Sequence, residues 1–152
     1  MTKVWCVRAD GGRYAKACVD SGFTGIGWGQ IGDLSAASSR DDLYPIYRAA
    51  YPQDTSNIVI GQQVGQLARF LFDMKAGDTV ITPDADGEQL WHGVVDPDPS
   101  YFYPPNDPNC RYGHRRRVTW SRQPLVRSGL SVPLQNTLQS SLTVFGVSQV
   151  DE

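Results

Sequence analysis

Two β-rich runs on either side of one short acidic turn constrain the fold of this 152-residue chain more than any other feature. Residues 79–83 (TVITP) and 89–95 (QLWHGVV) are apolar and rich in β-branched side chains, whereas residues 84–88 (DADGE) are polar and contain a glycine. This pattern predicts two antiparallel strands joined by a tight turn. A sheet therefore forms the centre of the chain, and the other segments must fold around it.

Further strand-like runs lie on both sides of this hairpin, at residues 3–9, 23–28, 115–121 and 142–147. Apolar residues at helical spacing predict helices between them, at residues 13–22, 38–52 and 60–78, with a turn and a short helix in 124–141. Residues 96–109, rich in Pro, Asp and Asn, predict a long surface loop. Together the segments predict a small α+β fold with a curved, barrel-like mixed sheet and flanking helices.

The length of the chain predicts one domain over residues 1–147, followed by a tail or linker at 148–152 (SQVDE). No apolar run approaches the ~20 residues that cross a bilayer. The chain starts with a strand-like run rather than a signal peptide. A soluble, cytoplasmic protein without a membrane partner is the expectation.

The three cysteines, Cys6, Cys18 and Cys110, form no closely spaced pair, which argues against a disulfide framework. Cys110 and His114 have a separation that zinc ligands also use, but the usual paired-ligand spacings are missing. We therefore expect reduced thiols, buried or in loops, and no bound metal or other cofactor.

Charge is unevenly distributed along the chain. The formal net charge is −2 and the pI is 5.6, so no global positive field attracts the protein to a polyanion. Residues 111–120 (RYGHRRRVTW) nevertheless contain four arginines and a histidine. A local basic patch is expected there.

The sequence carries no recognisable catalytic motif. Asp84 and Glu88 follow the order of carboxylates in many metal-dependent nucleases, but Leu90 occupies the position of the lysine that such sites need. Nucleophile elbows, phosphate-binding loops and zinc-protease motifs are missing. The chain is therefore expected not to be an enzyme, and the acidic segment is expected to be a hairpin turn.

Aromatic residues stand out instead. Trp28 lies between two glycines after a short apolar run, so its ring is either packed in a tight bend or open as a stacking platform. Base–aromatic stacking contributes about 1–3 kcal/mol per base, enough to bind one base without a strongly basic surface. Trp91 and Trp120 lie in predicted strands and are expected in the core.

The order of motifs along the chain resembles a known family. In sequence the motifs are VWCVRADGG, GFTGIGW, GDLS, IGQQVGQLARFLFDMKAGDTVITPD, LWHGVV, YGHRRRVTW and PLVRSGLSVPLQNTLQSSLTVFGV. They resemble the amino-terminal module of Mrr-type and related restriction endonucleases and, more distantly, the EVE, YTH and PUA-like superfamily of small barrels. The resemblance spans nearly the whole chain.

This resemblance implies a specificity module that reads a modified, for example methylated, base in DNA. The base is flipped into an aromatic-walled pocket, and a nuclease or ATPase effector of the restriction or defence system lies in another domain. Trp28 matches one pocket wall, and the loop at Thr82, Pro83 and Asp84 matches another, here without an aromatic residue. Asp84 would accept a hydrogen bond from an exocyclic amine or simply form the turn.

Other residues complete the expected site. Arg8 would face the same opening, and Ser140 and Ser141 would donate to a base edge. The expected contacts to the nucleic-acid backbone are Arg111, Arg115 and Arg116.

Three alternatives remain open. The same pocket would suit RNA or a small nucleotide, and the segment YFYPP at residues 101–105 would suit a protein partner. A nuclease that uses Asp84 and Glu88 with a metal ion is the third alternative.

Overall fold

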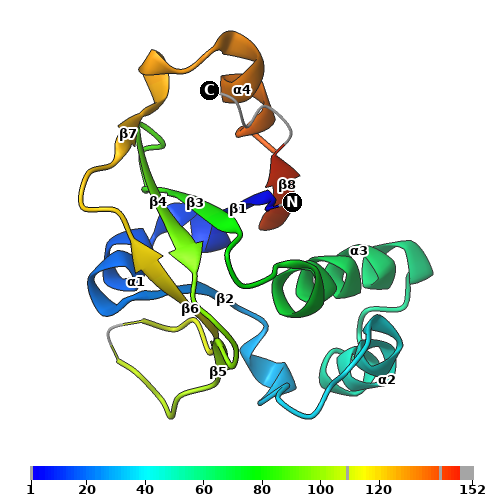
Figure 1. Cartoon of the computed structure of the whole chain (residues 1–152). Helices are drawn as coiled ribbons and strands as arrows, with labels where there is room; N and C mark the ends of the chain where they lie inside the picture. Colours follow the sequence, from blue (N-terminus) through cyan, green and yellow to red (C-terminus); the bar gives the residue numbers. More distant parts are fainter. Residues whose placement is uncertain (1, 109, 141, 148–152) are drawn as a thin grey trace.

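The structure is a computed structural model that describes residues 2–108, 110–140 and 142–147. Its fold is mixed α+β, with a curled sheet that forms half of a barrel (Figure 1). The described strands are β1 (Val4–Val7), β2 (Phe23–Ile26), β3 (Thr79–Pro83), β4 (Gln89–Val95), β5 (Tyr101–Phe102), β6 (His114–Trp120), β7 (Leu125–Val126) and β8 (Val144–Val147). The described α-helices are α1 (Ala15–Ser21), α2 (Arg40–Ala50), α3 (Asn57–Ala68) and α4 (Val132–Thr137).

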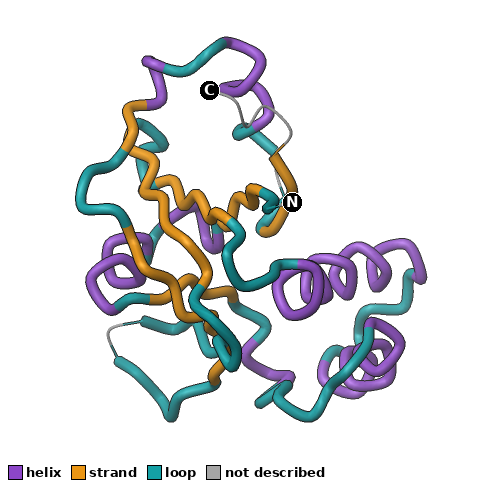
Figure 2. The backbone as a smooth tube through the Cα atoms, in the orientation of Figure 1, coloured by secondary structure: helices purple, strands orange, loops and turns teal. Residues whose placement is uncertain are grey.

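The sheet has the strand order β2-β6-β4-β3-β1-β8, with β5 paired to β6 and β7 paired to β4. All of these pairs are antiparallel except β1 with β3. Helices α2 and α3 pack together on one side of the sheet, and α4 lies near β7 and β8 at the other end (Figures 1 and 2). The predicted barrel-like α+β fold is confirmed at this level.

The central hairpin forms as the sequence predicts, because its turn chemistry is local. Asp84 Oδ1 accepts a hydrogen bond of 3.0 Å from the Gly87 amide, and Gly87 has a φ of 77°. A carboxylate that bonds the backbone a few residues ahead is typical of such turns. Of the two roles expected for Asp84, a hydrogen bond to a base or formation of the turn, the structure shows the turn.

Three predicted elements differ in extent. The strand predicted to reach Trp28 ends at Ile26, because Trp28 has left-handed backbone angles (φ 58°). The helix predicted for 60–78 begins at Asn57, where Ser56 caps it, and changes to π-helix over Arg69–Asp73. The predicted loop contains the short strand β5, which pairs with β6.

Three buried hydrophobic clusters hold these elements together. The largest lies between the sheet and α2, α3 and the π-helical segment, with Leu43, Leu67 and Phe70 among its fully buried residues. A second joins α4 to β8, β1 and β3, and a third includes Cys18, Phe23 and Cys110. Trp91 and Trp120, expected in the core, are half-buried, since their strands face solvent on one side.

No helix among the described residues is both long and apolar enough to cross a membrane. The predicted tail at 148–152 lies outside the described residues.

Candidate functional site in the loop cavity

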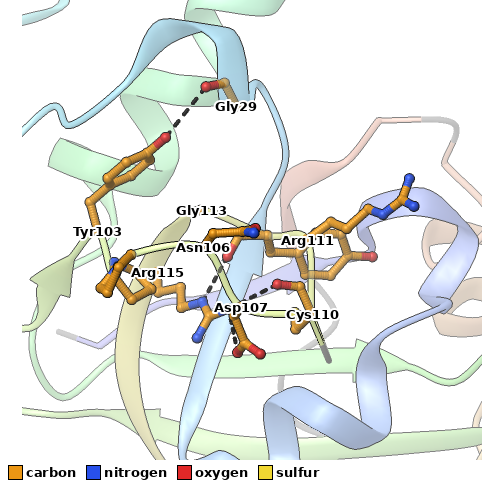
Figure 3. A pocket seen from close by; sticks show the side chains of 11 residues that line it. Gly29, Tyr103, Asn106, Asp107, Cys110, Arg111, Gly113 and Arg115 are labelled. Carbon is orange, nitrogen blue, oxygen red and sulfur yellow. Dashed lines mark hydrogen bonds and ion pairs between the residues drawn. The ribbon is translucent and has the colours of Figure 1, made fainter.

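A cavity of about 250 Å³ lies beneath the loop that connects β5 to β6. We call it the loop cavity. It is lined by Gly29 and by residues 103–107, 110–113 and 115 (Figure 3). Its walls combine an aromatic ring at Tyr103 with the polar groups of Asn106, Asp107 and Arg111. Ligand sites commonly join apolar surface to a few convergent polar groups in this way.

Tyr103 is fixed in the wall by contacts on two sides. Its hydroxyl donates to the Gly29 carbonyl at 3.4 Å, across the cavity in Figure 3, and its ring lies 5.2 Å from the His114 ring. A Cβ on Gly113 would approach the Tyr103 ring to 2.7 Å, so only glycine allows this close packing. The ring is half-buried and can stack on a ligand that enters the cavity.

His114 explains the geometry of the neighbouring bend. It is fully buried, and its Nε2 lies 3.1 Å from the Trp28 carbonyl while its Nδ1 lies 2.9 Å from the Tyr101 hydroxyl. Since a carbonyl only accepts, Nε2 carries the proton and Nδ1 accepts from Tyr101. Burial lowers the pKa of His114, so the ring stays neutral. The left-handed turn at Trp28, which brings Gly29 to the cavity wall, is thereby fixed.

Trp28, predicted as one wall of the base pocket, does not line the loop cavity. Its ring is half-buried against the largest cluster, its Nε1 donates to Gln63 Oε1 at 3.0 Å, and it lines none of the cavities described here. The indole is therefore packed in a tight bend rather than open as a platform. Its backbone, not its ring, contributes to the site.

Arg115 and Arg116, predicted to contact the nucleic-acid backbone, are both buried. Arg115 is 5% exposed and donates to the Tyr112 and Cys110 carbonyls and to Asp107. Arg116 is 3% exposed and donates to Ser100 and to two carbonyls of the π-helical region. Their guanidinium groups support the protein interior. Arg111 alone of the three is exposed, at the rim of the loop cavity.

The hairpin side of the predicted pocket forms a separate cleft of about 390 Å³, the hairpin cleft. Arg8 and Asp84 meet there with Arg127, a residue that the sequence analysis did not select. Arg8 donates to the Leu138 and Ser140 carbonyls, and Arg127 donates to the Gln135 carbonyl at 3.1 Å. Both arginines thus hold the segment of α4 against the sheet. Their acceptors lie at the C-terminal end of α4, where cations are favourable.

Thr82, Pro83 and Ser140 do not line that cleft. Thr82 and Pro83 are buried, and Thr82 lines an interior cavity of about 10 Å³ together with Thr24 and Tyr112. Ser140 takes part through its backbone carbonyl, which accepts from Arg8, while Ser141 lies outside the described residues. The structure therefore divides the predicted pocket among three places.

Sequence reasoning missed Tyr103, Asn106 and Asp107 as a site. The sequence predicts a long surface loop here, with residues 101–105 suited to a protein partner, but only the pairing of β5 with β6 brings the loop residues over Gly29. Burial and a hydrogen bond with Asp86 raise the pKa of Asp84 in the other cleft. The described residues contain no group of three or more His, Cys, Asp or Glu placed to hold a metal ion.

Fold and site define a half-barrel α+β protein with a polar, partly aromatic cavity beside its longest loop. The chain belongs to the family described as "Domain of unknown function (DUF8426)", whose model matches residues 5–147. Comparisons with curated proteins and with solved structures gave no match.

Proposed function

We propose that this chain is a nucleic-acid recognition module of the PUA/EVE-like type that holds one extruded, modified DNA base in the loop cavity. The observation that carries the proposal is the joint presence of a stacking ring, a primary amide, a carboxylate and an exposed arginine around one cavity. Together these groups suit a flat heterocycle whose edge has both donors and acceptors.

The cavity volume favours a base over a larger ligand. About 250 Å³ is below the roughly 300–1,000 Å³ of sites that enclose drug-sized molecules. A cavity of this volume suits a single base better than a complete nucleotide, whose sugar and phosphate would stay outside near Arg111. Asn106 supplies a donor and an acceptor, and Asp107 accepts from an exocyclic amine while it also accepts from Arg115.

Discrimination of a methyl group must come from shape as well as from burial. One buried methyl contributes only about 0.8 kcal/mol. Extrusion of a base costs a few kcal/mol and is easiest where pairing is weakened. A reader of this kind would belong to a modification-dependent restriction or defence system, with the nuclease effector in another domain.

Binding of matched DNA duplexes tests the proposal. The duplexes differ only in one methylated adenine or one methylated cytosine, and affinity is measured by fluorescence anisotropy. We expect tighter binding to one modified duplex. Replacement Tyr103→Ala should weaken that binding about 5- to 150-fold through lost stacking.

Matched variants complete this test. Tyr103→Phe keeps the ring and loses only the hydroxyl bond to Gly29, so it should retain affinity. Tyr44→Ala, on α2 away from the cavity, should have no effect. Equal affinity of the wild-type protein for all duplexes, unchanged in Tyr103→Ala, would overturn the proposal.

A second candidate is a free modified nucleoside or a base in RNA. The observation that favours it is the burial of Arg115 and Arg116, which leaves fewer cations beside the cavity for a DNA backbone. Competition of a labelled duplex with free nucleosides and with RNA of the same sequence separates the two candidates. An RNA reader should depend on the 2′-hydroxyl, and a nucleoside-binding protein should gain nothing from flanking nucleotides.

A further inference from the structure

Two of the three free cysteines belong to one buried cluster next to the loop cavity. Cys18 on α1 and Cys110, which precedes β6, are both buried and belong to one cluster with Phe23 and Tyr112. The two thiols lie close enough to shift each other's pKa, although the residues are far apart in the sequence. Cys6 lies in a different cluster, against α4 and β8. The structure therefore contains one thiol pair and one isolated thiol.

The two members of the pair have different surroundings. Cys110 lines the loop cavity, so a small molecule in that cavity lies next to it, whereas Cys18 lines the interior cavity behind it. Arg115 donates from Nη2 to the Cys110 carbonyl at 3.1 Å, which holds a positive charge beside the thiol. A thiolate near a cation is the reactive form of cysteine, and an adjacent second thiol can resolve its oxidation.

Protonation follows the same asymmetry. The interaction with the Cys18 thiol lowers the pKa of Cys110, against the effect of burial, with further lowering by the Tyr112 amide and Arg115. The hydrogen bond to Cys110 and burial raise the pKa of Cys18. Burial raises the pKa of the isolated Cys6 to about 12. The pair therefore favours a thiolate at Cys110 and a thiol at Cys18.

We propose that Cys18 and Cys110 are a redox pair, in which a hydroperoxide that enters the loop cavity oxidises Cys110 and Cys18 then closes a reversible disulfide. The inference rests on the paired geometry and on the cavity, and it needs no assumption about the base site.

The chemistry balances in two steps. The Cys110 thiolate attacks the terminal oxygen of the hydroperoxide, an S–O bond forms, the O–O bond breaks, and the departing alkoxide or hydroxide takes a proton from water. The product is a sulfenic acid. The Cys18 sulfur then attacks the Cys110 sulfur, an S–S bond forms, and hydroxide leaves with the Cys18 proton as water. Two thiols are oxidised, and the peroxide is reduced to an alcohol and water, or to two waters.

Mass spectrometry of the full chain after exposure to hydrogen peroxide tests this inference. We expect a loss of two hydrogens that dithiothreitol reverses, and a proteolytic peptide that links Cys18 to Cys110. In Cys18→Ser we expect one added oxygen on Cys110 instead of the link. In Cys110→Ser we expect both remaining thiols to stay reduced under the same treatment.

Cys6→Ser is the matched control, since it removes a buried thiol outside the pair and should leave the linked peptide unchanged. A disulfide that includes Cys6, or oxidation of Cys6 at the same rate as Cys110, would overturn the inference. So would a chain that stays fully reduced while its circular dichroism spectrum shows a folded protein. None of these results depends on whether DNA is bound.

Discussion

His114 connects the bend at Trp28 to the start of β6 through a chain of hydrogen bonds. The Leu34 amide donates to the Tyr101 hydroxyl, this hydroxyl donates to His114, and His114 donates to the Trp28 carbonyl. Protonation of His114 would turn its acceptor nitrogen into a donor, so the Tyr101 hydroxyl could no longer donate to it and would lose its acceptor. The neutral ring is therefore a requirement of the native geometry around the loop cavity.

This requirement predicts an acid sensitivity. Burial lowers the pKa of His114 in the folded protein below the ordinary histidine value of 6.5, so the unfolded chain binds the proton first as pH falls. The free energy of unfolding should therefore decline below about pH 6.5, by at most about 1.4 kcal/mol per pH unit. Urea unfolding at a series of pH values measures the decline.

A pair of histidine variants assigns this effect. His114→Gln should abolish the decline, and His92→Gln, at a half-buried position of β4, should keep it. A decline of equal size in His114→Gln would show that another group titrates, and the neutral-histidine interpretation would be wrong.

Thr82 is buried without a hydrogen-bond partner. Among the described residues its Oγ1 is the one buried side-chain oxygen or nitrogen for which no partner is found. An unpaired buried hydroxyl costs about 1–3 kcal/mol, which an isosteric apolar side chain avoids. We predict that Thr82→Val raises the free energy of unfolding by about 1 kcal/mol in chemical denaturation.

The control for this prediction is Thr119→Val. The Thr119 hydroxyl donates to Asp96 at 2.7 Å on the surface, so its removal should lower stability slightly. If Thr82→Val also lowers stability, the hydroxyl has a partner in solution, such as a water in the interior cavity, whose volume is close to that of one water.

At the scale of elements, local patterns were enough to predict the hairpin and α1. Residues 79–83 and 89–95 form β3 and β4 as predicted, since the Asp84 turn lies within the same short segment. Helix α1 ends at Gly22, whose φ of 77° suits the glycine that the sequence provides. These elements depend on neighbours along the chain, so a sequence contains the information directly.

The arginine run shows what local reasoning lacked. Successive residues of a strand point to opposite faces, so three consecutive arginines in a strand must place at least one toward the interior. Both Arg115 and Arg116 are buried, because the loop before β6 covers one face and the π-helical segment covers the other. Such coverage depends on segments that are distant in the sequence. For the same reason, the sequence alone does not show that Tyr103 and Gly29 are neighbours.

Arg116 is the contact that joins β6 to the π-helical segment. Its Nη1 donates to the Phe70 and Met74 carbonyls at 2.6 and 2.8 Å, and its Nε donates to Ser100 at 2.7 Å. Carbonyls at a helix end have no partner within the helix, so they depend on such donors. Arg116→Met, which keeps much of the length and loses the donors, should lower the free energy of unfolding by about 3 kcal/mol.

Arg117→Met is the neighbouring control. Arg117 is exposed, and its guanidinium carbon lies 4.2 Å from the centroid of the Phe102 ring, so its loss should cost less than about 1 kcal/mol. Hydrogen exchange at Arg69–Asp73 should accelerate in Arg116→Met alone. Equal effects of the two variants on stability and exchange would contradict the assigned role of Arg116.

At the scale of the whole molecule, the charge distribution limits how a nucleic acid can bind. The net charge of −2 already includes Arg115 and Arg116, whose guanidinium groups are buried and cannot reach a phosphate. Among the described residues that line the loop cavity, Arg111 is the exposed cation. In the proposed complex, affinity for a modified duplex would therefore come mainly from the base in the cavity, with little from the backbone.

This argument predicts a weak dependence of binding on salt. Each phosphate contact adds about −0.9 to the slope of the logarithm of the association constant against that of the salt concentration. One or two contacts give a slope between about −1 and −2 for the preferred duplex, measured by anisotropy across a salt series. Arg111→Ala should remove about one phosphate contact and so make the slope about 0.9 less negative, and Arg116→Met should not change the slope. A slope steeper than about −5 would mean that other surfaces bind several phosphates. The proposal that the base in the loop cavity supplies most of the affinity would then be wrong.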